Sequence, residues 1–369
     1  MKNELSRRNM LRALTLGAVG IAANGALTPK TDAQDAPKPA AREITGDPRI
    51  RGPFPILSTP FLESGEVDFD TLGLQAKFVD WCGCSGMIWP QAGDAVDLLT
   101  TEEKLQGMTV LKDALKNRQK SALCLGVNGK DADDVLVYAR HANELGADAI
   151  ISRPPDDGKT EDDMYAYFRA IAGAVECPVI IQTSGGTKYK GPSPSLKMLI
   201  ELAKEFPHFG YVKEETSPIE ARMRSLVEAK PTIKRVFSAM GGYGWLRQCR
   251  IGTEGLITER AVYADLLEFI WREADMGDKV IAADAYGKLL LMLNLKQSIS
   301  GNELRGYHLY VWQKRGVCKN RISREYGPNN AIPEKPILRE QALTDEEKEE
   351  IDVRFAALKP YLRKGTFQA

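Results

Sequence analysis

The chain has 369 residues, of which 43% are hydrophobic and 27% charged, and its 50 basic residues balance its 50 acidic ones. This composition is typical of a globular domain, and the absence of a basic stretch interleaved with aromatic residues argues against nucleic acid as a partner. The 3 histidines are too few and too scattered for a histidine-based metal site. We therefore expect neither a metal nor a cofactor.

Residues 1–35 have the pattern of an export signal. Arg7 and Arg8 stand in a basic S-R-R-N-M-L-R segment, and Ala13 to Ala23 form a weakly apolar run too short to span a bilayer. The arginine pair in this setting resembles a twin-arginine translocation signal. We expect export of the folded protein to the periplasm, with no stable membrane span. The start of a disordered tether and then a linker, residues 36–52, are expected to follow.

Short apolar runs alternate with segments of helical periodicity from residue 53 onward. The eight expected strands are 54–59, 86–89, 122–127, 147–152, 178–183, 209–213, 235–239 and 255–258. The helices expected between them are 69–82, 101–115, 132–145, 162–174, 196–205, 218–228 and 244–250. Eight parallel strands covered by helices predict an α/β fold, a (β/α)₈ TIM barrel over residues 53–262. An open doubly wound sheet is the alternative, but no G-x-G-x-x-G motif follows the first strand.

The alternation stops after the eighth strand. The periodicity then predicts only helices, at 266–276, 279–293, 300–317 and 343–362. We interpret residues 263–369 as a C-terminal helical extension. Because it carries more apolar residues than one helix face needs, we expect a homo-oligomer that buries Leu289 to Leu293.

Lys213 is the strongest catalytic candidate. It closes the apolar run Phe209 to Val212, and Glu214 and Glu215 follow it. An amine at a low-dielectric strand end can lose its proton and attack a carbonyl as a Schiff-base nucleophile. A lysine beside two glutamates is more often a solvated ion pair, but the carboxyl end of a barrel strand favours catalysis. Since side chains alternate along a strand, Glu215 should lie on the side of Lys213 and Glu214 should face away.

The ends of the other strands supply polar candidates for the same site. Gln182 ends the fifth strand and is expected beside Lys213, and Arg153 follows the fourth. The residues expected to contact a substrate are Thr59, Gln91, Gly93, Asp94, Thr183, Ser184, Ser238 and Thr258.

These residues stand in motifs that resemble the dihydrodipicolinate synthase and N-acetylneuraminate lyase family of pyruvate-dependent class I aldolases. The resemblance covers residues 53–362 and is carried by S-T-P-F from Ser58, L-T-T-E-E from Leu99 and G-Y-V-K-E from Gly210. It implies that Lys213 forms a Schiff base with pyruvate or a related 2-oxo acid, which then reacts as an enamine. It also implies a small-molecule substrate and a dimer or tetramer.

The sequence departs from the family pattern at four places. The catalytic tyrosine falls on Gln182, whose amide cannot act as an acid or base. The carboxylate-binding Gly-Thr-Thr-Gly-Glu loop falls on Gln91 to Ala95, where both threonines are missing and Asp94 would repel a carboxylate. The tyrosine supplied by a neighbouring subunit falls on Asp156, and the arginine after strand 5 falls near Lys188.

Three interpretations follow from these residues. In the first, a Schiff-base lyase or aldolase uses Lys213, and Glu215, Asp94 or water replaces the tyrosine as proton carrier. In the second, the barrel binds a small ligand outside the cytoplasm without catalysis. In the third, Asp94, Asp156 and Glu215 support another barrel chemistry such as metal-assisted hydrolysis. Export would separate the protein from cytosolic lysine biosynthesis, so a sugar acid suits it better.

Overall fold

The computed structural model describes residues 45–297, 299 and 306–368. The expected twin-arginine signal and the start of the helix expected at 300–317 lie outside these residues. Within them, no helix is both long enough and apolar enough to cross a lipid bilayer.

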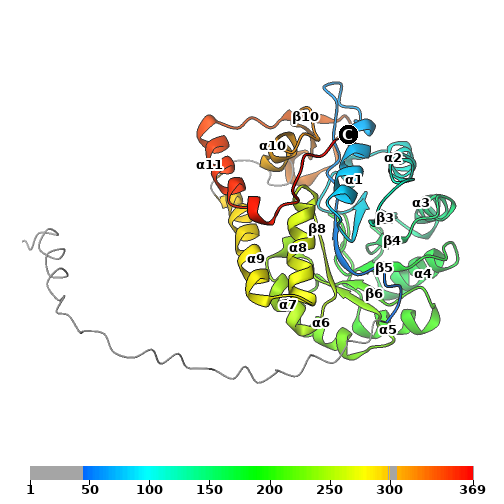
Figure 1. Cartoon of the computed structure of the whole chain (residues 1–369). Helices are drawn as coiled ribbons and strands as arrows, with labels where there is room; N and C mark the ends of the chain where they lie inside the picture. The colour runs from blue at the N-terminus through cyan, green and yellow to red at the C-terminus, as the bar shows by residue number, and fades with distance from the viewer. Residues whose placement is uncertain (1–44, 298, 300–305, 369) are drawn as a thin grey trace, which may run out of the picture. The chain divides into compact units, whose positions relative to one another are not determined.

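Eight parallel strands form the barrel that the sequence predicts (Figure 1). They are β1 Gly52–Pro55, β2 Gly86–Trp89, β3 Ala122–Gly126, β4 Ala149–Ser152, β5 Val179–Gln182, β6 Tyr211–Lys213, β7 Arg235–Phe237 and β8 Gly255–Thr258. Strands β2 to β7 make one sheet in chain order, and β1 pairs with β8. The bridges Ile56–Ile88 and Ser238–Leu256 join the two sheets. The ring of strands is therefore closed, and the open-sheet alternative is wrong.

One helix follows each strand and covers the outside of the barrel (Figure 1). These helices are α1 Phe69–Trp81, α2 Thr101–Ala114, α3 Ala132–Glu144, α4 Glu161–Ala172, α5 Leu196–Glu205, α6 Ile219–Glu228, α7 Trp245–Ile251 and α8 Ala264–Asp275. Short 3₁₀ helices are η1 Val96–Leu98, η2 Met240–Gly242, η3 Ala261–Tyr263, η4 Asn294–Gln297, η5 Pro328–Asn330 and η6 Lys359–Tyr361.

The buried apolar side chains form two layers, because alternate residues of each strand face inward and outward. The inner cluster fills the barrel and includes Ile151, Ile180, Tyr211, Phe237 and Ile257. The larger outer cluster packs the strands against the helices. Membership of the inner cluster therefore identifies which strand positions point into the barrel.

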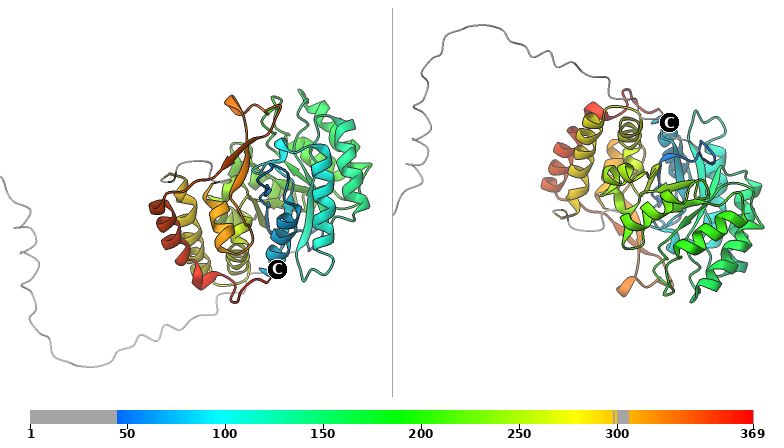
Figure 2. Two further views of the ribbon diagram at one scale, coloured as in Figure 1. Left: turned by 90° about the horizontal axis from the view of Figure 1, so that it is seen from above. Right: turned by 90° about the horizontal axis from the view of Figure 1, so that it is seen from below.

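The C-terminal extension contains the expected helices and, in addition, a pair of strands that the sequence pattern does not predict. The helices are α9 Lys279–Leu293, α10 Tyr307–Lys314 and α11 Asp345–Ala356, and the antiparallel strands are β9 Ile322–Glu325 and β10 Ile337–Glu340. Helix α9 packs on α8 and α11 packs on α9 (Figure 1). The β9–β10 hairpin lies on the side of the extension nearer to α1 and α2 (Figure 2).

The expected oligomer interface at Leu289 to Leu293 needs correction. Leu289, Met292 and Leu293 are fully buried inside the chain, so they are not available to a partner subunit. Large apolar side chains that are exposed on α9 and α11, or directly after α8, are Met276, Val280, Ile281, Leu291 and Val353. Oligomer formation itself stays a prediction.

Arg324 of β9 fastens the hairpin to two loops of the barrel. Its guanidinium donates to the carbonyl oxygen of Gly65 (2.8 Å) and to that of Leu98 (2.9 Å), and it pairs with Glu103 (2.6 Å). It also lies over the ring of Phe61, 4.7 Å from the centroid. Glu103 in turn closes a capping box at the start of α2. One side chain therefore sets the loops after β1 and β2 against the extension.

We predict that Arg324→Ala lowers the free energy of unfolding by about 3 kcal/mol, because it leaves a partly buried carboxylate and two carbonyl groups without a donor. Urea unfolding followed by tryptophan fluorescence measures the loss. Arg339→Ala is the matched control, since Arg339 lies exposed on the neighbouring strand β10. Equal losses in the two variants would contradict the role given to Arg324.

Candidate functional site

Lys213 and Gln182 lie side by side at the mouth of the barrel. They are the last residues of β6 and β5, and the two positions are partners in the sheet register. Each follows an inner-cluster residue, Tyr211 or Ile180, by two positions, so each side chain points inward. Lys213 is 3% exposed and Gln182 is 1% exposed.

Four side chains form a closed ring of polar contacts at this mouth. The Nζ atom of Lys213 donates to Oε1 of Gln182 (3.0 Å) and lies 3.2 Å from Oε1 of Glu215. The hydroxyl of Ser184 donates to the other oxygen of Glu215 and accepts a bond from Nε2 of Gln182 (3.0 Å). The ring holds an amine against a carboxylate, and each has a second polar partner.

Glu214 lies on the opposite face of β6, as the alternation predicts. Its carboxylate accepts bonds from Oγ1 of Thr183 (2.7 Å) and the backbone N–H of Thr216 (2.7 Å). It also pairs with Arg222 of α6 at 3.0 Å. Because Thr183 points to this outer face, its hydroxyl does not join the group around Lys213, where the sequence analysis places it.

Thr59 and Asp94 bind each other and connect two loops of the barrel. Strand β1 ends at Pro55, so Thr59 lies in the following loop and not at the strand end that the sequence predicts. Its N–H donates to Asp94 (2.9 Å), its hydroxyl also donates to that carboxylate, and Nε1 of Trp89 donates to the hydroxyl (2.9 Å). Asp94 thus ties the loop after β2 to the loop after β1. With its oxygens turned to Thr59, it is a poor candidate for the proton carrier.

The loop after β2 contains one buried donor without an acceptor. Gln91 is fully buried, and its Oε1 accepts bonds from the N–H of Ala92 (2.8 Å) and from Nδ2 of Asn128 (3.1 Å). Its Nε2 has no partner among the described residues. Gly93 has a φ of 97°, and a Cβ there would lie 3.4 Å from Cβ of Glu259. This loop therefore meets the loop after β8.

Ser238 and Thr258 both face away from the barrel interior, because each directly follows a residue of the inner cluster, Phe237 or Ile257. The hydroxyl of Ser238 lies 3.0 Å from that of Thr253, which precedes β8. The hydroxyl of Thr258 donates to Glu259 (3.3 Å). Neither joins the group around Lys213 that the sequence predicts. Glu259 was not among the expected site residues, although its position two residues after Ile257 could have indicated it.

Arg153 is a second charged group at the mouth and was given no role from the sequence. It is 3% exposed, and its Nη2 pairs with Asp97 and, at 3.4 Å, with Asp156. Burial opposes the charged form, but the two carboxylates outweigh it and raise the pKa of Arg153 above its usual value. Burial raises the pKa of Asp156, against the opposing effect of Arg153.

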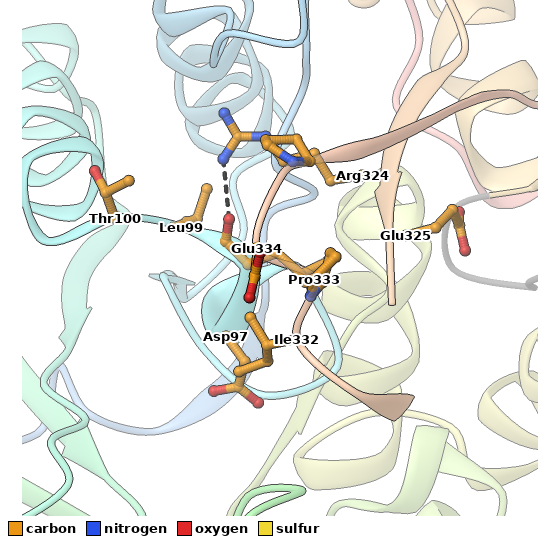
Figure 3. A pocket seen from close by; sticks show the side chains of 10 residues that line it. Asp97, Leu99, Thr100, Arg324, Glu325, Ile332, Pro333 and Glu334 are labelled. Carbon is orange, nitrogen blue, oxygen red and sulfur yellow. Dashed lines mark hydrogen bonds between the residues drawn. The ribbon is translucent and has the colours of Figure 1, made fainter. Parts of the chain in front are cut away.

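Asp97 also lines a cavity of about 240 Å³ between the loop after β2 and the β9–β10 connection. Figure 3 shows Asp97, Ile332 and Glu334 around this cavity, with Arg324 beside it. The lining residues are Asp97, Leu98, Leu99, Thr100, Arg324, Glu325, Ile332, Pro333, Glu334 and Pro336. Lys213 is not among them, so its amine does not face this cavity. The cavity is connected to the group at the mouth only through Asp97, which pairs with Arg153.

A sequence model of the Dihydrodipicolinate synthetase family matches residues 49–303. The chain belongs to this family. Its members include class I, Schiff-base-forming aldolases and lyases, so the resemblance inferred from the motifs is confirmed at the level of the family.

Individual relatives are distant. The 4-hydroxy-tetrahydrodipicolinate synthase of Chlorobaculum parvum is 28% identical over 215 residues, which cover 58% of this chain and 70% of the relative. The corresponding enzyme of Laribacter hongkongensis is 29% identical over 183 residues, or 49% of this chain and 61% of the relative.

Solved structures support the barrel fold. The dihydrodipicolinate synthase from Aquifex aeolicus superposes with a TM-score of 0.69 and 21% identity, over 85% of this chain and 100% of that one. The sialic acid aldolase of Ruminococcus gnavus gives a TM-score of 0.71 and 18% identity, over 85% and 100% of the two chains.

Proposed function

We propose that the protein is a Schiff-base lyase or aldolase that acts through Lys213 on a 2-oxo acid or a sugar-acid-like substrate. The observation that carries the proposal is the contact between Nζ of Lys213 and Oε1 of Glu215, 3.2 Å apart at the mouth of the barrel. A related fold neighbour, the sialic acid aldolase of Ruminococcus gnavus, is described with a catalytic lysine.

Glu215 transfers the protons, which is the role that a tyrosine has elsewhere in the family. Nζ first passes a proton to Glu215 and then, as the neutral amine, attacks the 2-oxo carbon, so an N–C bond forms and the carbonyl electron pair moves to oxygen, which takes the proton from Glu215. Glu215 next removes a proton from nitrogen and gives it to the new hydroxyl. The C–O bond breaks, water leaves, and a protonated imine remains. Gln182 does not titrate, so it only holds the amine through Oε1, and Ser184 holds Glu215.

The imine then acts as an electron sink for cleavage. In a substrate with a hydroxyl on carbon 4, Glu215 takes the hydroxyl proton, carbon 4 leaves as an aldehyde, and the electron pair of the bond between carbons 3 and 4 moves toward the iminium nitrogen and gives an enamine. Glu215 returns the proton to carbon 3, and hydrolysis by water releases the shorter 2-oxo acid and free Lys213. In the carbon–oxygen version, Glu215 instead removes a proton from carbon 3 of the imine, and the resulting enamine expels the hydroxyl of carbon 4, which takes that proton and leaves as water.

A non-catalytic binding protein is the second candidate. It is favoured by Gln182 at the tyrosine position and by the loss of both threonines from the loop Gln91 to Ala95. The same barrel mouth would then hold a small carboxylate or sugar outside the cytoplasm without reacting with it.

We predict that borohydride traps a covalent adduct on Lys213 when the protein is incubated with pyruvate or another 2-oxo acid. Intact and peptide mass spectrometry locate the adduct, and Lys213→Ala should abolish it. If calorimetry detects a bound carboxylate or sugar while no 2-oxo acid gives a reducible adduct, the binding protein replaces the enzyme.

A second prediction separates the two neighbouring glutamates. Glu215→Gln should slow the exchange of pyruvate methyl protons for deuterium by roughly a hundredfold, the usual contribution of a positioned general base. Proton NMR in D₂O measures this exchange, which follows enamine formation without knowledge of the full substrate. Glu214→Gln is the matched control, because Glu214 faces α6; it should lower stability and leave most of the exchange rate. Equal slowing by both variants would remove Glu215 from its proposed role.

We also propose export through the twin-arginine pathway, on the basis of the Arg7–Arg8 pair. Replacing both arginines with lysine should retain the protein in the cytoplasm, since that pathway reads the arginine pair. Fractionation of the native host measures the distribution, and an unchanged distribution would refute export by this route.

A further inference from the structure

We infer that Arg153 binds the carboxylate of the 2-oxo acid whose carbonyl Lys213 attacks. This inference rests on the proposed function, since it assigns one group of the substrate to one side chain of the same site. It makes Arg153 a specificity-determining residue, because a buried guanidinium would select acids over neutral carbonyl compounds.

Arg153 occupies the same level of the barrel mouth as Gln182 and Lys213. Ser152 faces outward, where its hydroxyl lies 2.9 Å from that of Tyr167 on α4, so the next residue, Arg153, faces inward. Ser152 pairs with Ile181, and Gln182 pairs with Lys213. Arg153, Gln182 and Lys213 therefore stand in order on three adjacent strands. Since neighbouring strands lie about 4.8 Å apart, roughly 10 Å separates the main chains of β4 and β6.

The guanidinium of Arg153 is held at one nitrogen only. Its side-chain hydrogen bonds to described residues, those to Asp97 and Asp156, both come from Nη2. Nε and Nη1 donate to no other group in the described part of the chain. A carboxylate matches two parallel donors of an arginine, and a fixed guanidinium loses little freedom when it binds one.

The loop after β5 lies directly against this guanidinium. A Cβ atom at Gly186 would lie 2.4 Å from Cζ of Arg153, so only glycine allows the backbone to approach so closely. The contact confines the planar group from one side, and the pairs with Asp97 and Asp156 confine it at Nη2. Arg153 is thus fixed in position before any ligand arrives.

A second hydrogen-bond donor, Nε2 of Gln91, is linked to Arg153 through Asn128. The N–H of Arg153 donates to Oδ1 of Asn128 (3.2 Å), and Nδ2 of Asn128 donates to Gln91 (3.1 Å). Gln91 retains a buried Nε2 with no described acceptor. Asp97 and Gln91 both lie in the loop after β2, where the family's carboxylate-binding threonines fall. Arg153 therefore brings a positive charge to the place where the two hydroxyls are missing.

The charges around Arg153 balance before any ligand binds. Asp97, Asp134 and Asp156 carry three negative charges, and Lys104 and Lys188 interact electrostatically with one or more of them. With Arg153 the six groups sum to zero. A carboxylate is therefore recognised through the donors Nε and Nη1 of the guanidinium and not through an excess of positive charge.

Calorimetric binding of oxamate tests the inference, because this pyruvate analogue keeps the carboxylate and does not require imine formation. Arg153→Lys keeps the positive charge but loses the two parallel N–H donors of the guanidinium, and Arg153→Gln loses the charge as well. Each should weaken oxamate binding by about tenfold or more. The neutral ester ethyl oxamate should bind the unaltered protein and both variants equally. Arg169→Gln, an exposed substitution on α4, is the control, and circular dichroism checks the fold of each variant.

Loss of oxamate affinity with unchanged ester binding supports the inference. Unchanged oxamate binding in both variants, equal weakening of acid and ester, or no oxamate binding by the unaltered protein would each overturn it. Borohydride trapping of pyruvate on the same samples distinguishes failure of the Schiff-base function from failure of the carboxylate assignment to Arg153. Arg153-dependent oxamate binding without a trapped imine defeats the Schiff-base function alone, and an imine that forms independently of Arg153 defeats only the carboxylate assignment.

Discussion

The register of three parallel strands is the constraint on which the site depends. Pairing of β4, β5 and β6 brings Arg153, Gln182 and Lys213 to the same level, and the alternation of side chains turns all three toward the barrel axis. A shift of one residue in β6 would exchange Lys213 for a neighbour and turn the amine toward the helices. The positions of the polar groups at the mouth are therefore fixed by the backbone hydrogen bonds of the barrel.

Placing a carboxylate beside the amine changes how the site can handle protons. A tyrosine at position 182 could donate and accept a proton, whereas the amide of Gln182 can do neither. In the proposed mechanism the proton transfer passes to Glu215, which the ring through Ser184 and Gln182 keeps within 3.2 Å of Nζ of Lys213. Such a ring satisfies buried polar atoms that would be costly if left alone, so the same contacts serve stability and proposed catalysis.

The sequence predicted the features that follow from the periodicity of buried residues. It missed an exposed strand and the exact end of the first strand, because neither has a periodic apolar pattern. The barrel, and the opposite orientations of Glu214 and Glu215, follow from alternation and were found. Thr59 was misplaced because the first strand ends four residues earlier than its apolar run suggests. The β9–β10 hairpin was missed because β10 is exposed along its length, and an exposed strand has no buried face to mark it. Arg153 was visible at a strand end, but its ion pairs join segments that sequence spacing cannot relate.

The clamp made by Arg324 has a consequence for the order in which the protein is built. Its bond to Gly65 connects positions 259 residues apart, and its pair with Glu103 connects positions 221 residues apart. A ribosome adding about 5–20 residues per second needs on the order of ten seconds or more to pass from the second of these loops to the arginine that holds it. During translation the barrel strands can pair while the rim beside Asp97 still lacks its outer wall. The rim of the mouth beside Asp97 is thus completed late, by an arginine that only about 45 residues follow before the chain ends.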